Sequence, residues 1–192
     1  MLAMLAMPDK PRKRSVTCYN LIFPVWLLFS PLGMPILVWL GPMGRWLVLA
    51  MLAGNFAVDW LVTALGLKLA GIGDIRRRVW RVILRVWLFG YAADAVSILP
   101  LILLMRHPAE SAWFDANIEF PLLYGNPFTS LPALLILTAC LLLAGVLIYF
   151  FNMKWGLKNA NLEQRDRRRV ALTLALLTMP YTFLIPTSLT YV

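Results

Sequence analysis

Two carboxylic acids stand in stretches of this chain that are otherwise almost entirely apolar. Asp59 lies in NFAVDW, residues 55–60, and Asp94 lies in GYAADAVS, residues 90–97. An isolated charge at the centre of a bilayer costs from about 2.5 to more than about 10 kcal/mol. Two neighbouring carboxylates also repel each other, so at least one of them should hold a proton near neutral pH. A shared proton, a bound cation or a water-filled cavity would make such a pair tolerable.

The spacing of each acid from the nearest basic residue places both acids at one depth. Asp59 precedes Lys68 by nine residues, and Asp94 follows Arg85 by nine. With a rise of 1.5 Å per residue, each acid lies about 13 Å from the charged edge of its helix, near the middle of a bilayer. The two helices are consecutive, antiparallel and joined by a short loop. We therefore expect them to be neighbours, with the carboxyl groups side by side.

Two polar residues complete the candidate site. Asn55 shares a helix face with Asp59, because residues four apart stack on one another, and Ser97 follows Asp94 by about one turn. One interpretation is a proton- or cation-binding site on a transport path, formed by Asp59, Asp94, Asn55 and Ser97. The other is a protonated pair that joins helices through hydrogen bonds of about 0.6 kcal/mol or somewhat more each. The sequence leaves both open.

The composition identifies the elements that must position these residues. The 192 residues are 61% hydrophobic, whereas soluble domains have about 45–50% apolar residues, and the mean hydropathy is +0.75. About 20 apolar helical residues cross the hydrocarbon core. We predict an all-α polytopic membrane helix bundle, with a single domain (residues 1–192) and five transmembrane helices at about 19–40, 46–67, 80–105, 127–152 and 170–189.

The basic residues give this bundle an orientation. With a cytoplasmic N-terminus, 16 of the 18 basic residues fall on the inner side, in the N-terminal tail and within 68–85 and 154–169. Only Arg45 and Arg106 fall outside. Lys and Arg collect in cytoplasmic loops, so the sequence predicts that the N-terminus is cytoplasmic and the C-terminus is outside.

The first predicted span contains three prolines. Pro24, Pro31 and Pro35 interrupt 19–40, and interior prolines kink or break a helix. A re-entrant hairpin is the alternative, but it would put either the basic tail or the later basic loops outside, so a kinked span fits the charges better. The opening MLAMLAM precedes the basic KPRKR, which is the reverse of the order in a signal peptide. We expect an uncleaved anchor.

A basic stretch leads into the third predicted span. Residues 74–87, DIRRRVWRVILRVW, contain five arginines: Arg76, Arg77, Arg78, Arg81 and Arg85. Arginines beside tryptophans suit the anionic lipid headgroups of an inner leaflet, and a membrane protein partner could also dock on them. Topology explains the net charge of +9, so we expect no nucleic acid to bind.

The sequence offers little for catalysis. It contains no GxSxG, HExxH, Walker A or CxxC motif. His107 and Glu110 are a weak metal-site pattern, and Cys18 and Cys140 stand at different membrane depths. We therefore expect neither an enzyme nor a bound cofactor or metal.

The runs YNLIFPVWLL, NFAVDWLV, RVWLFGYAAD and YFFNMKWGLK, with the closing PYTFLIPTS, resemble those of small polytopic bacterial membrane proteins. The resemblance implies a bacterial inner-membrane protein and carries no activity. From the residues we predict ion- or proton-linked transport through the acid pair, in a homo-oligomer because five short-looped helices leave little room for a path. The alternative is a non-catalytic accessory or regulatory subunit of a larger membrane complex.

The predicted topology can be tested by cysteine labelling in intact cells. Single cysteines placed in 41–45 or 106–126 should react with a membrane-impermeant reagent, and those in 68–79 or 154–169 should react only after lysis. Labelling of 154–169 in intact cells would contradict the predicted orientation.

Overall fold

The structure is a computed structural model that describes residues 38, 41–106 and 111–190. Its described elements are helices and turns, with no strand among them. Three helices are long and apolar enough to cross a membrane, and they match the second, third and fourth predicted spans: α3 (Pro42–Leu69), α4 (Ile75–Arg106) and α7 (Leu131–Lys154). The prediction of an all-α chain with membrane-length helices is confirmed for these residues.

Some predictions fall on residues outside this part of the chain. The first predicted span, 19–40, lies outside the described residues except for Val38, and so do Cys18, His107 and Glu110. Cys140 is described, and it is buried as a free thiol in α7.

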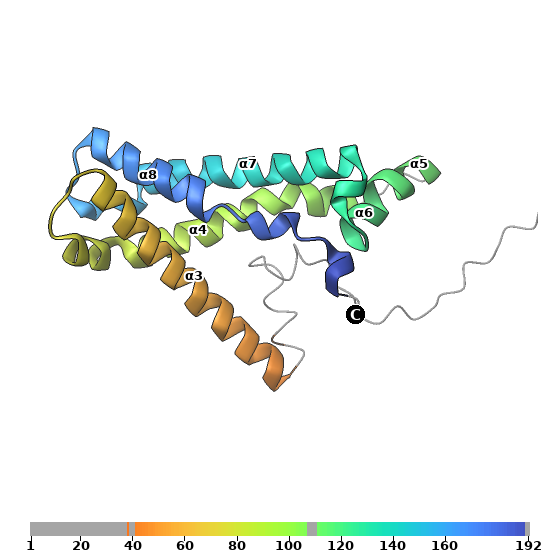
Figure 1. Cartoon of the computed structure of the whole chain (residues 1–192), viewed down its shortest axis with the longest axis horizontal. Coiled ribbons are helices and arrows are strands. Elements are labelled where there is room, and N and C mark those ends of the chain that lie inside the picture. Colours follow the sequence, from red (N-terminus) through yellow and green to blue (C-terminus); the bar gives the residue numbers. More distant parts are fainter. Residues whose placement is uncertain (1–37, 39–40, 107–110, 191–192) are drawn as a thin grey trace, which may run out of the picture.

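A short turn joins α3 to α4. Gly71 has a φ of 74° and Asp74 a φ of 53°, and both values lie in the left-handed region. Glycine adopts this region without steric cost, and Asp is one of the few other residues enriched there. The turn sends α4 back along α3, so the two helices are adjacent and antiparallel (Figure 1).

The helices are arranged as a four-membered bundle in the described residues. α3 packs against α4 and against α8 (Gln164–Thr178), and α7 packs against the same two helices. Figure 1 shows α4 and α7 side by side along most of their length, whereas α3 diverges from the other helices toward its N-terminal end. Met43 and Trp46 at that end are 85% and 72% exposed. The α3 residues that join the apolar core with α4, α7 and α8 run from Phe56 onward and so lie in its C-terminal half, which carries Asp59.

The buried residues form two apolar clusters, one toward each end of α4. The first joins α3, α4, α7 and α8 near the 70–74 turn, and includes Val62, Leu67, Val82, Val86, Ile148 and Leu174. The second surrounds the other end of α4 and includes Ile98, Leu101, Leu137 and Phe183. The candidate site lies on the helices between these clusters.

The segment between α4 and α7 caps the end of the bundle opposite the 70–74 turn. It consists of α5 (Ala112–Phe114), the π-helical η1 (Asp115–Glu119), α6 (Phe120–Leu123) and the 3₁₀ turn η2 (Pro127–Thr129). One apolar face, Phe114, Ile118 and Leu122, is buried in the second cluster. Phe120 and Trp113 on the other face are about 60% exposed.

The fifth predicted span differs from the prediction. The sequence predicted one helix over 170–189, but α8 begins earlier, at Gln164, and ends at Thr178. Two short 3₁₀ segments follow, η4 (Tyr181–Leu184) and η5 (Thr187–Thr190). Pro180 and Pro186 stand before these segments, and proline removes the N–H that a continuing helix would donate. The apolar stretch 170–189 is thus the end of a helix followed by two 3₁₀ turns.

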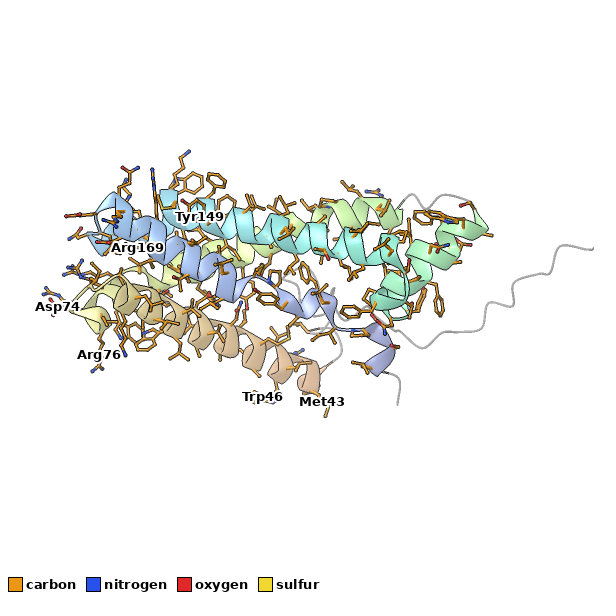
Figure 2. The ribbon with its side chains drawn as sticks, turned by 45° about the horizontal axis from the view of Figure 1, so that its top comes forward. Met43, Trp46, Asp74, Arg76, Tyr149 and Arg169 are labelled. Atoms are coloured by element: carbon orange, nitrogen blue, oxygen red, sulfur yellow. The ribbon has the colours of Figure 1, made fainter. Side chains whose placement is uncertain are left out.

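The charged loops gather at one end of the bundle. Figure 2 shows Asp74, Arg76 and Arg169 at one end of the molecule, and Met43 and Trp46 at the far end of α3. The 3₁₀ segment η3 (Gly156–Ala160), which follows α7, packs against α4 at the charged end. The two segments predicted to be cytoplasmic, 68–79 and 154–169, therefore share one end.

The crossing of α3 and α8 depends on a glycine. A Cβ added to Gly66 would stand 3.2 Å from Val170 Cγ1 and 3.3 Å from Val170 Cα, whereas one added to Gly54 in the same helix would meet nothing within 4 Å. We expect Gly66→Ala to lower the free energy of unfolding by about 1–3 kcal/mol through overpacking. Gly54→Ala is the matched control and should leave stability unchanged or slightly raised, because alanine is the better helix former.

Thermal unfolding of the purified protein in detergent measures both variants. Equal stability of the two would show that the α3–α8 contact is not close at Gly66.

Candidate functional site

Asp59 is a buried acid on the side of α3 that faces α4. Its side chain is 3% exposed. A Cβ added to Gly90 of α4 would lie 3.5 Å from Asp59 Oδ2, so the carboxyl group lies directly against the α4 backbone. At this distance an added Cβ and the carboxyl oxygen would be in ordinary van der Waals contact. The nearby Thr63 hydroxyl donates its proton to the Asp59 backbone carbonyl at 2.7 Å. It therefore does not donate to the Asp59 carboxyl group.

Asp94 approaches the same interface from α4. Its Oδ1 atom is buried and has no hydrogen-bond partner among the described residues. The two carboxyl groups, of Asp59 and Asp94, are close enough to interact electrostatically. The structure therefore brings together the two acids that the sequence placed at one depth on adjacent helices.

The acid pair has no positive counterpart in the part of the chain that the structure describes. No lysine or arginine contributes to the electrostatic environment of either carboxyl group there. Burying unpaired charge in apolar surroundings is costly, and the usual remedy is a proton or a bound cation. The interface is therefore suited to take up positive charge.

The two other predicted site residues have different roles. Asn55 makes a side-chain hydrogen bond with Tyr91 across the α3–α4 interface. Ser97 is fully buried, and its hydroxyl donates to the Asp94 backbone carbonyl at 2.9 Å. Asn55 thus belongs to the interhelical cluster around the acids, whereas the Ser97 proton is used within its own helix.

Tyr91 is a member of this cluster that the sequence analysis missed. Besides bonding to Asn55, it interacts electrostatically with both Asp94 and Asp59. Its ring also packs edge-on against Trp87, with centroids 5.3 Å apart. A signal was present in the sequence, because Tyr91 lies three residues before Asp94 and four after Trp87, which puts all three on one helix face.

A metal centre has no support among the described residues. They contain no group of three or more His, Cys, Asp and Glu side chains able to hold a metal ion.

The five predicted headgroup-binding arginines divide into two groups. Arg76, Arg77, Arg81 and Arg85 are exposed, and the first two line an open hollow with Asp74, Ile75 and Trp80. Arg78 instead points into the bundle, where Nη1 donates to the backbone carbonyls of Ala160 at 2.6 Å and Asn161 at 3.0 Å. The exposed arginines remain available to lipid or a partner, and Arg78 joins α4 to the loop after α7.

Comparisons with known proteins add no assignment: no protein family, curated protein or solved structure matches this chain.

The role of Arg78 can be tested against its neighbour. Arg78→Ala removes two charge-assisted hydrogen bonds to loop carbonyls, each worth about 1.5–3 kcal/mol, and we expect a loss of stability of at least about 2 kcal/mol. Arg77→Ala is the matched control and should change stability by less than about 0.5 kcal/mol. Thermal unfolding in detergent measures both. An Arg78→Ala variant as stable as Arg77→Ala would contradict the anchoring role.

Proposed function

We propose that this protein carries out ion- or proton-linked transport across a bacterial inner membrane through the carboxyl pair of Asp59 and Asp94. The observation that supports the proposal most is the pair of interacting acids at the α3–α4 interface, Asp59 buried and Asp94 half-buried, without a basic partner among the described residues. Intramembrane ionisable groups in such a setting commonly mark ion or proton pathways.

The hydrogen bonds favour transport over a purely structural pair. An acid that serves to join helices should donate to or accept from the neighbouring helix. Instead, Asp94 Oδ1 lacks a partner in the described residues. The two hydroxyls nearest the acids, of Thr63 and Ser97, donate to backbone carbonyls of their own helices. The carboxyl oxygen Asp94 Oδ1 is therefore left without a hydrogen bond in the described residues, and it can accept a proton or contact a bound cation.

The pair can hold positive charge in steps. Binding of one proton or one monovalent cation reduces the combined charge of two carboxylates from −2 to −1, and a second binding event neutralises it. Loss of positive charge restores the repulsion between the acids and the cost of burying them. Uptake and release on opposite sides of the membrane would amount to transport.

The setting of the pair belongs to the same proposal. Helices α3, α4 and α7 span the membrane, with the charged end of the bundle toward the cytoplasm and the C-terminus outside. The 16 basic residues of the predicted inner segments support this orientation. The protein acts as a homo-oligomer in the lipid bilayer, because a bundle of this size offers little room for a complete path.

The proposal is tested by Asp59→Asn and Asp94→Asn in liposomes. Asparagine keeps the shape and hydrogen bonding of aspartate but does not titrate. We expect each variant to fold and to lose at least about 90% of its flux, a tenfold effect that corresponds to about 1.4 kcal/mol. Flux is followed with an entrapped pH-sensitive dye for protons and with radioactive sodium or rubidium for monovalent cations.

The matched control is Asp74→Asn, the same substitution in the exposed turn. Asn tolerates the positive φ of this position, so flux should remain at the wild-type level. Wild-type flux in both intramembrane variants would contradict transport through the pair. Stable co-purification with a larger membrane complex would then favour the accessory or regulatory subunit.

A further inference from the structure

We propose that the α3–α4 interface binds a lipophilic organic ammonium ion, held between the Asp59 and Asp94 carboxyl groups and the aromatic rings of Tyr91, Trp87 and Phe56. The inference rests on the proposed function and names the class of cation that the acid pair takes.

A continuous set of aromatic rings leads up to the acids. Phe56 of α3 meets Trp87 of α4 in a T-shaped contact at 6.0 Å and approaches Trp80 at 6.4 Å. Trp87 meets Tyr91 at 5.3 Å with an interplanar angle of 85°. Tyr91 in turn interacts with both carboxyl groups. The negative charge of the pair and the π-faces of the rings therefore belong to one cluster.

The groups around the pair include aromatic rings as well as oxygen atoms. Around the pair, the described side chains supply the two carboxyl groups, the Asn55 amide and the Tyr91 hydroxyl, which bond to each other, and the hydroxyls of Thr63 and Ser97. The rings of Tyr91, Trp87 and Phe56 form one connected set, and aromatic faces with a carboxylate are the usual surroundings of a quaternary ammonium ion.

Unused polar groups at the same interface also point to an occupant. Asp94 Oδ1 and the indole Nε1 atoms of Trp60 and Trp87 are buried without a hydrogen-bond partner in the described residues. Buried polar atoms are usually paired, so each unpaired one requires an explanation. An organic cation would satisfy the Asp94 carboxyl group by charge.

The position of the rings suits entry from the lipid. Phe56, Trp60, Trp87 and Tyr91 are all half-buried, so they are neither sealed in the core nor fully on the surface. Leu61 and Leu88 beside them are exposed to about 60%, which continues the apolar surface outward. An organic cation with apolar substituents partitions along such a surface, whereas a hydrated metal ion does not.

Binding of benzyltrimethylammonium to the purified full-length protein in detergent tests the inference. The titration follows tryptophan fluorescence at constant ionic strength, with protein-free micelles as the blank. We expect saturable binding that Asp59→Asn and Asp94→Asn each weaken at least about tenfold, since each removes a charge from a low-dielectric site. Tyr91→Leu should weaken binding about tenfold by removing a cation–π face.

Two further variants separate the aromatic effect from misfolding. Tyr91→Phe keeps the ring and should stay within about threefold of wild type. Tyr149→Leu is the matched control, because Tyr149 is also a half-buried tyrosine in edge-on contact with another ring, Phe150 of α7. It should bind the probe as the wild type does.

The outcomes distinguish this inference from the function on which it rests. Aspartate-dependent sodium or proton flux without benzyltrimethylammonium binding would overturn the organic-cation inference and leave the proposed function intact. Equal binding by wild type, Asp59→Asn and Asp94→Asn would also overturn it. If the folded wild type shows neither benzyltrimethylammonium binding nor aspartate-dependent flux, both the organic-cation inference and the proposed transport function are wrong.

Discussion

The rest of the structure depends on the placement of two acids in one apolar helix interface without a basic partner in the described chain. Such a pair is unfavourable unless positive charge reaches it. The Asp59 carboxyl group lies against the α4 backbone at Gly90. Asn55 and Tyr91 then bond across the same interface. The cluster thus combines repulsion between the two carboxyl groups with an Asn55–Tyr91 hydrogen bond that holds α3 and α4 together.

The packing at the charged end of the bundle supplies the frame for this cluster. There, four helices share one apolar core, Gly66 brings α3 onto Val170 of α8, and Arg78 joins α4 to the loop after α7. These contacts fix the C-terminal half of α3 and the N-terminal half of α4. Asp59 lies within the packed half of α3, and Asp94 lies on α4 between the two apolar clusters.

The sequence predicted the features that depend on the distance between residues along one helix. It missed those that depend on which face of a helix a residue occupies, or on where proline removes a backbone hydrogen bond. Asp59 and Asp94 could be matched because a continuous helix separates each from a basic residue. Tyr91 was overlooked because tyrosine in an apolar span suggests a lipid interface, although it shares a face with Trp87 and Asp94. Arg78 was grouped with its neighbours, yet it is four and eight residues before the buried Val82 and Val86, which places it on the inward face. The fifth span was drawn too long because hydropathy counts apolar residues, not the N–H groups that Pro180 and Pro186 lack.

Helix α3 packs against the other helices mainly through its C-terminal half. This affects how a cation larger than a proton would bind. The Asp59 carboxyl group lies close against the α4 backbone at Gly90, so an occupant much larger than a proton must separate α3 from α4 there. The helix best able to move is α3, since its N-terminal half diverges from the bundle (Figure 1) and exposes Met43 and Trp46. A ligand shifts a conformational equilibrium only by its difference in affinity for the two states. A cation that binds the separated acids more tightly than the closed pair would therefore couple its own binding to a displacement of α3, which is the kind of coupling that transport requires.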